Sequence, residues 1–138
     1  MIVAVGTAQG EDAAAWQVLE HLDDRAFAPA GCVVRRARID RPGTDLLPLL
    51  CGAGHAVVLD AMRGGGPPGT VRLLDRRELS LVDDRLSCHA LGVAEVLALA
   101  DALGELPQVL HVVGIAGGAF DARRAALAVT DLLRARLG

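Results

Sequence analysis

Three side chains in this sequence could together bind a divalent metal ion: Asp12, Asp60 and His89. Two carboxylates and one imidazole supply two oxygen ligands and one nitrogen ligand. This set suits a borderline divalent transition metal and leaves coordination positions open for a substrate. Each of the three residues stands where an apolar segment gives way to a loop or a helix. We therefore expect them to form one metal site that also carries the catalytic chemistry.

Each residue also has a purely structural interpretation. The helix dipole favours an acid such as Asp12 at a helix start, and Asp60 could cap a strand end or form a turn. His89 could be a hydrogen-bonded histidine at the start of a helix. Asp60 lies 48 residues after Asp12, and His89 follows after another 29, so they form no local metal motif. The three residues together indicate a metal site more strongly than any one of them does alone.

The residues around this set could indicate a nucleophile or a nucleotide-binding loop, but the signals for these are weaker than the signal for a metal site. Cys88 next to His89 could form a Cys–His nucleophile, but adjacent side chains rarely face each other and no cysteine-protease signature surrounds them. Ser87 fits the N-cap of a following helix and lacks a Gly-x-Ser-x-Gly elbow. The segment 6–10 contains two glycines but matches neither a dinucleotide fingerprint nor a P-loop.

Length and composition limit the class of protein. With 138 residues we expect one domain over 1–138, whose core is packed with aliphatic side chains because the chain has one Trp, two Phe and no Tyr. The net charge of −3 without a basic stripe argues against nucleic acid as a partner. The apolar runs are too short for a signal peptide or a membrane span, so we expect a cytoplasmic protein. Cys32 and Cys51 are interpreted as small core residues.

The elements that must position the candidate site alternate along the chain. Apolar runs predict strands, and 3.6-residue periodicity or stop signals predict helices. The predicted strands are 2–5, 32–39, 56–60, 70–74 and 109–113, and the predicted helices are 11–22, 44–51, 90–103 and 122–137. Arginines in 32–39 place that strand near an edge, and Thr44 is the expected cap of its helix. Glycine ends the last strand at Gly114.

This alternation predicts an α/β fold, a three-layer α/β/α sandwich with a mostly parallel, roughly five-stranded twisted sheet. In such sheets ligands bind at the carboxyl ends of the strands. Asp12 and Asp60 follow the apolar parts of two predicted strands. The fold prediction and the metal-site prediction therefore agree on one edge of the sheet.

Five segments, taken in order, resemble the maturation endopeptidases of nickel–iron hydrogenases, and the resemblance extends over nearly the whole chain. The segments are Val58-Leu59-Asp60-Ala61, Pro68-Gly69-Thr70-Val71, Leu86-Ser87-Cys88-His89-Ala90-Leu91-Gly92, Leu103-Gly104-Glu105-Leu106-Pro107 and Val113-Gly114-Ile115. In that family the metal-binding residues are an acid of an acidic pair, the Asp of the apolar strand and the His of the Ser-x-His segment. These correspond to Asp12, Asp60 and His89.

The resemblance implies an endopeptidase that removes the C-terminal extension of a hydrogenase large-subunit precursor after nickel insertion. It also implies that the nickel arrives with the substrate, while zinc or cadmium could occupy the site in vitro. The chain departs from the family in its first loop, where Gly6-Thr7-Ala8-Gln9 replaces Gly-x-Gly-Asn and several residues are missing. An alternative is therefore a non-catalytic checkpoint module of the same fold that docks on a hydrogenase subunit.

Overall fold

A computed structural model describes residues 1–8, 10–62, 66–75 and 90–137, and for residues 11, 12, 90, 91 and 137 it describes the backbone alone. The strands in this part of the chain are β1 (Ile2–Val5), β2 (Arg36–Ile39), β3 (His55–Met62), β4 (Val71–Leu74) and β5 (Val109–Ala116). The α-helices are α1 (Ala14–His21), α2 (Pro42–Leu50), α4 (Ala90–Ala102) and α5 (Ala122–Leu137). Two short 3-10 helices are η1 (Gly10–Ala13) and η2 (Asp24–Ala26).

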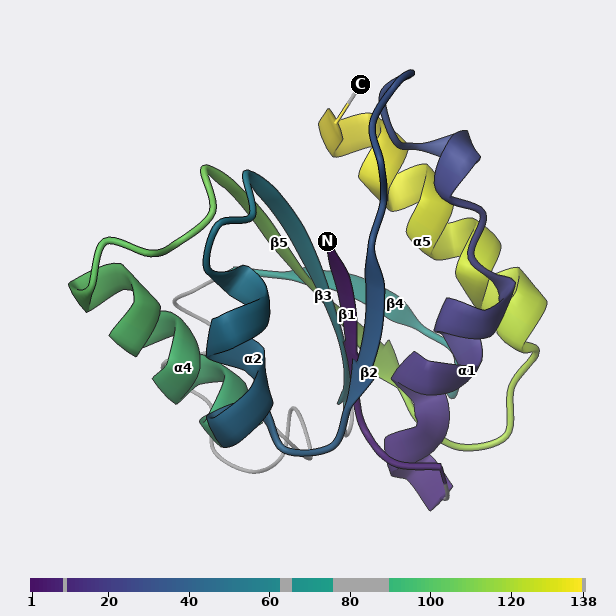
Figure 1. The fold of residues 1–138 in the computed structure, drawn as a ribbon. Coiled ribbons are helices and arrows are strands. Elements are labelled where there is room, and N and C mark those ends of the chain that lie inside the picture. Colours follow the sequence, from purple (N-terminus) through teal and green to yellow (C-terminus); the bar gives the residue numbers. More distant parts are fainter. Residues whose placement is uncertain (9, 63–65, 76–89, 138) are drawn as a thin grey trace.

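The described strands form one five-stranded sheet in the order β2-β1-β3-β5-β4 (Figure 1). The pairs β1–β2, β1–β3 and β3–β5 are parallel, whereas β4 pairs antiparallel with β5. The carboxyl ends of the four parallel strands therefore lie at one edge of the sheet. This arrangement confirms the predicted α/β fold with a mostly parallel sheet.

Helices cover both faces of the sheet and make three layers. Along β3, Val57, Leu59 and Ala61 pack in one core with side chains of α1 and α5. Val58 and Met62 pack in the other core with side chains of α2 and α4. A strand that is buried on both faces must be apolar at nearly every position. This explains why β3 is a continuous apolar run that a single residue, Asp60, interrupts.

The edge strand β2 is shorter than predicted. It begins at Arg36, because its ladder with β1 begins at the pair Ile2↔Arg36. Two of the preceding apolar residues lie outside the core, because the side chain of Val33 is 89% exposed and Cys32 is exposed, whereas Val34 is half-buried against the core. Cys51, after α2, is also exposed. The prediction that these two cysteines are core residues was therefore wrong. Small apolar side chains fit a core, but in these two places no element covers them.

Two predicted boundaries were also wrong. Helix α2 begins at Pro42 with Arg41 as its N-cap, so Thr44 lies inside the helix. A proline fits the first helical position because its fixed φ suits a helix and its missing N–H would have no partner there. At the other boundary, β5 continues through Gly114 to Ala116. Gly114 is thus an interior residue of a strand, and its surroundings are described below.

The indole of Trp16 ties α1 to the sheet. Its Nε1–H is shared between the carbonyl oxygens of Ala4 and Ile39, at 3.2 and 3.3 Å. Ile39 is the last residue of β2, and Ala4 is the penultimate residue of β1. The guanidinium of Arg38 lies over the indole ring, 5.3 Å from its centroid. Trp16 thus fixes the start of α1 against the carboxyl ends of the neighbouring strands β1 and β2.

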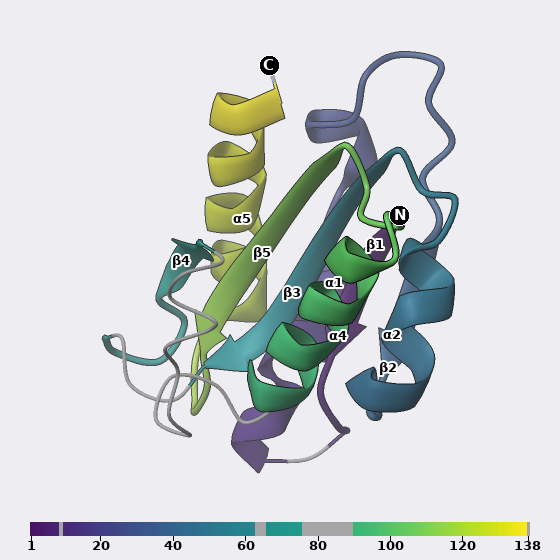
Figure 2. The ribbon, with the colours of Figure 1, turned by 90° about the vertical axis from the view of Figure 1, so that its left-hand side faces the viewer.

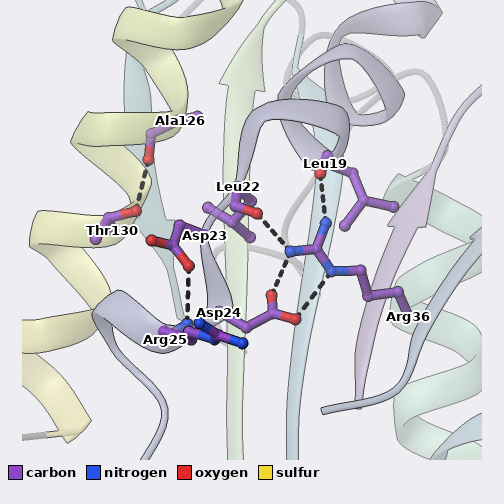
Figure 3. A network of polar contacts seen from close by, with 8 residues as sticks. All are labelled: Leu19, Leu22, Asp23, Asp24, Arg25, Arg36, Ala126 and Thr130. Carbon is purple, nitrogen blue, oxygen red and sulfur yellow. Dashed lines mark hydrogen bonds and ion pairs between the residues drawn. The ribbon is translucent and has the colours of Figure 1, made fainter.

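Arg36 ties the other end of α1 to the same edge strand (Figure 3). Its Nη1 donates to the Leu19 carbonyl at 2.8 Å, and its Nη2 donates to the Leu22 carbonyl. Nε and Nη2 also donate to the two carboxylate oxygens of Asp24, at 3.0 and 2.5 Å. The carbonyls at a helix end lack partners within the helix, so one planar guanidinium caps α1 and holds η2 at once.

We expect Arg36→Lys to lower the free energy of unfolding by about 1–3 kcal/mol, because an ammonium cannot reproduce the two-pronged contact with a carboxylate and reach two carbonyls. Denaturant unfolding followed by circular dichroism measures the change. The matched control is Arg123→Lys, since Arg123 is an exposed residue of α5. The control substitution should lower the free energy of unfolding by about 0.5 kcal/mol or less. Equal losses in the two variants would contradict the capping role.

Candidate functional site

Asp60 lies inside β3, two residues before the strand ends, and its side chain is fully buried, at 0% exposure. The sequence predicted that Asp60 is the last residue of its strand. This prediction was wrong, because the strand continues to Met62. The backbone of Asp60 pairs with Val5, the last residue of β1, on one side and with Gly114 on the other. Since Val58 and Met62 belong to the α2/α4 core, alternation along the strand directs Asp60 to that face.

Among the described residues, Asp60 is the only charged side chain that is fully buried. The other buried polar side chain of the described set is that of Thr130, whose hydroxyl donates to the Ala126 carbonyl one helical turn earlier. Taking a carboxylate out of water is costly, so a carboxylate is rarely kept in an apolar core without a use. The burial of Asp60 therefore favours a functional position over a strand cap or a turn.

The backbone of Asp12 belongs to η1, which follows β1 and contacts β3. The neighbouring Ala13 is buried at 2% exposure, which fixes this turn against the domain. The described structure contains the backbone of Asp12 but not its side chain. Asp12 thus lies in the element that follows the carboxyl end of β1, and its role as a ligand stays a prediction.

His89, with Ser87 and Cys88, lies outside the described residues. The residue that follows it in the sequence, Ala90, begins α4. A Cβ placed on Gly92 would lie 2.9 Å from Cγ of Pro42, the first residue of α2. Val93 is fully buried in the same core as Met62. The first turn of α4 therefore packs on the face of the sheet to which Asp60 belongs.

Figure 2 shows that η1, the first turn of α4 and the ends of β3 and β5 all lie at the carboxyl edge of the sheet. Figure 1 shows the same end from a second direction. Within the described side chains, no three His, Cys, Asp or Glu residues group as metal ligands. Two of the three predicted ligands have side chains outside that set, so the ligand prediction stays untested. The chemistry of two carboxylates and an imidazole still fits a divalent transition metal.

Sequence reasoning missed Gly114 and Met62, which flank Asp60. A Cβ on Gly114 would lie 2.9 Å from the Sδ of Met62 and 3.1 Å from Cδ1 of Leu74. A glycine inside a strand often marks a place where another group approaches closely. The signal in the sequence is this glycine between β-branched residues, in Val113-Gly114-Ile115. The same glycine led to the wrong prediction that the strand ends there.

Other features of the described residues lie away from this edge. A cavity of about 330 Å³ opens at the amino ends of the strands, where Phe27, Val34 and His55 line it. The pKa of His111, in the amino-terminal half of β5, is lowered because burial disfavours the imidazolium, and because Arg136 and His55 repel its charge. No helix in the described part of the chain is both long and apolar enough to cross a membrane.

Comparison with known proteins gives a consistent result. The family model described as HycI, hydrogenase maturation protease, matches residues 42–125. The hydrogenase expression/formation protein HoxM of Cupriavidus necator is 30% identical over 120 residues, which are 83% of this chain and 58% of that protein. The hydrogenase 2 maturation protease of Escherichia coli is 33% identical over 75 residues, which are 53% of this chain and 46% of that protein. The chain thus spans about half the length of these relatives.

A solved structure agrees on the fold. The solution structure of an endopeptidase from Escherichia coli superposes with a TM-score of 0.65 and 22% identity. The match covers 98% of this chain and 88% of the other. At this level of identity, the similarity establishes the arrangement of the elements.

Proposed function

Because the chain belongs to the family of hydrogenase maturation proteases, whose model matches more than half of its 138 residues, we propose that it is an endopeptidase for a nickel–iron hydrogenase. Its substrate is the large-subunit precursor, and its product is the same subunit without the C-terminal extension. The nickel belongs to the substrate: it is inserted before cleavage and is recognised in place. Zinc or cadmium could substitute for it in vitro.

The observation that supports this proposal most is the buried carboxylate of Asp60. It lies on a central strand, in the face to which the first turn of α4 packs, beside the end of β1 that leads into η1. A ligand held by a strand that is paired on both sides has little freedom to move. Such a ligand can fix a metal-bearing substrate in one orientation.

In this proposal, Asp60 and Asp12 donate carboxylate oxygens and His89 an imidazole nitrogen to the nickel of the precursor. Binding the metal places the peptide bond next to it at the carboxyl edge of the sheet. Orienting a reacting bond converts an encounter in solution into a reaction within one complex, which can lower the activation barrier by several kcal/mol. The bound divalent ion would polarise the carbonyl or activate a water molecule.

The test is to incubate the protein with its cognate precursor in two forms, one loaded with nickel and one without it. We expect the loaded precursor to become shorter on a gel and the nickel-free precursor to stay intact, because only the first offers an ion for the three ligands. Equal cleavage of both forms would contradict nickel recognition. Tight binding of the loaded precursor without cleavage would support the checkpoint module in place of the enzyme.

A further inference from the structure

Gly114 lies directly across from Asp60 in the ladder between β3 and β5. Its missing side chain would point to the α2/α4 face, because the atoms that a Cβ would meet belong to Met62 and Leu74, two members of that core. Glycine weakens a strand, since it adds backbone entropy to the unfolded chain and packs nothing. A glycine at the centre of the sheet therefore requires a local reason.

The reason is space rather than backbone conformation. The φ angle of Gly114 is not in the positive range that favours glycine. A Cβ there would lie 2.9 Å from Sδ of Met62, 3.1 Å from Cδ1 and 3.4 Å from Cγ of Leu74. The first distance is shorter than side-chain contacts allow. The thioether of Met62 therefore occupies the volume that any other residue at position 114 would fill.

The place of Met62 bears directly on Asp60. Met62 follows Asp60 by two residues on the same strand and the same face, and it leans across to β5 over Gly114. Met62 is 2% exposed and Leu74 is 5% exposed, so neither side chain can move aside into solvent. Leu74 closes the side toward β4. If position 114 carried a side chain, the space left for the thioether would lie over β3, where Asp60 stands.

We propose that Gly114 is a positioning residue for Asp60: it gives the thioether of Met62 a place over β5 and so keeps it away from the Asp60 carboxylate. This inference rests on the proposed function, in which Asp60 is a ligand for the nickel of the substrate. Gly114 affects metal binding through Met62. The effects of substitutions at Gly114 and Met62 on metal affinity should therefore be coupled.

The experiment is titration of the purified protein with nickel(II) chloride by calorimetry, at a temperature where every variant is folded by circular dichroism. Gly114→Ala should weaken nickel binding about tenfold or more, because overpacking shifts side chains in a filled core. The matched control is Gly54→Ala, since a Cβ on Gly54 would meet no atom within 4 Å. The control should bind nickel like the wild type. Normal affinity in Gly114→Ala, with only a loss of stability, would overturn the proposal.

A second pair of variants tests the coupling, including the case in which Gly114→Ala does not fold. The double variant Gly114→Ala/Met62→Ala lacks the displaced thioether and should bind nickel as Met62→Ala does. If alanine at position 114 still weakens binding in the absence of Met62, the proposed path through Met62 is wrong. Asp60→Asn separates this failure from a failure of the function. If Asp60→Asn retains normal affinity, the ligand assignment itself fails, and the role of Gly114 fails with it.

Discussion

Asp60→Asn should abolish processing of the nickel-loaded precursor, with a loss in rate of about a hundredfold or more. The amide keeps the shape of the carboxylate but removes its charge, so the buried site loses an anionic ligand without losing volume. Because Asp60 is buried at 0% exposure on a strand paired on both sides, its side chain has a fixed position. The measurement is the mobility shift of the precursor on a gel over time.

The control for this variant is Asp131→Asn, which removes an exposed carboxylate from α5. It should process the precursor like the wild type, while both variants keep the circular dichroism spectrum of the folded protein. Cleavage by Asp60→Asn at the normal rate would contradict the metal-site interpretation. Cys88→Ser belongs in the same assay. Its activity should be normal, and a loss of activity in Cys88→Ser alone would revive the thiol nucleophile.

His89→Ala should weaken the binding of nickel or zinc to the isolated protein by about ten- to a hundredfold, because it removes the single nitrogen ligand of the proposed set. Binding to the wild type should also weaken in acid, since an imidazole binds metal in its neutral form and protons compete for it. Calorimetric titration at several pH values measures both effects. The control is His21→Ala, at an exposed position in α1. Equal affinities of the wild type and His89→Ala would show that His89 is not a ligand.

The sequence predicted the layers of this fold because the signals for them are local and strong. The apolar run that became β3 is buried on both faces, and helices with one apolar stripe must cover such a sheet. The edge position of β2 also followed from its arginines. Asp60 could be singled out for a related reason: a carboxylate that directly follows an apolar run is visible in the sequence, although β3 continues for two residues beyond it.

The features that the sequence did not predict depend on residues distant in the chain. The sequence predicts a strand end at Gly114 because glycine breaks local structure, but Met62 and Leu74 make a glycine fit inside β5. Cys32 and Cys51 have core-like side chains, and only the three-dimensional arrangement leaves them exposed. At the start of α2 two signals compete within three residues, and the proline at position 42 determines the start rather than Thr44.

The shared hydrogen bonds of Trp16 give the protein a built-in optical probe. Trp16 is the only tryptophan and the chain has no tyrosine, so ultraviolet-excited emission above 300 nm comes from this one ring. Its Nε1–H bridges Ala4 and Ile39 at the carboxyl ends of β1 and β2, close to where η1 leaves the sheet. Emission from an indole responds to its hydrogen bonds and to a cation on its face. Fluorescence of the unlabelled wild type therefore reports directly on movement at this edge when a metal or a precursor binds.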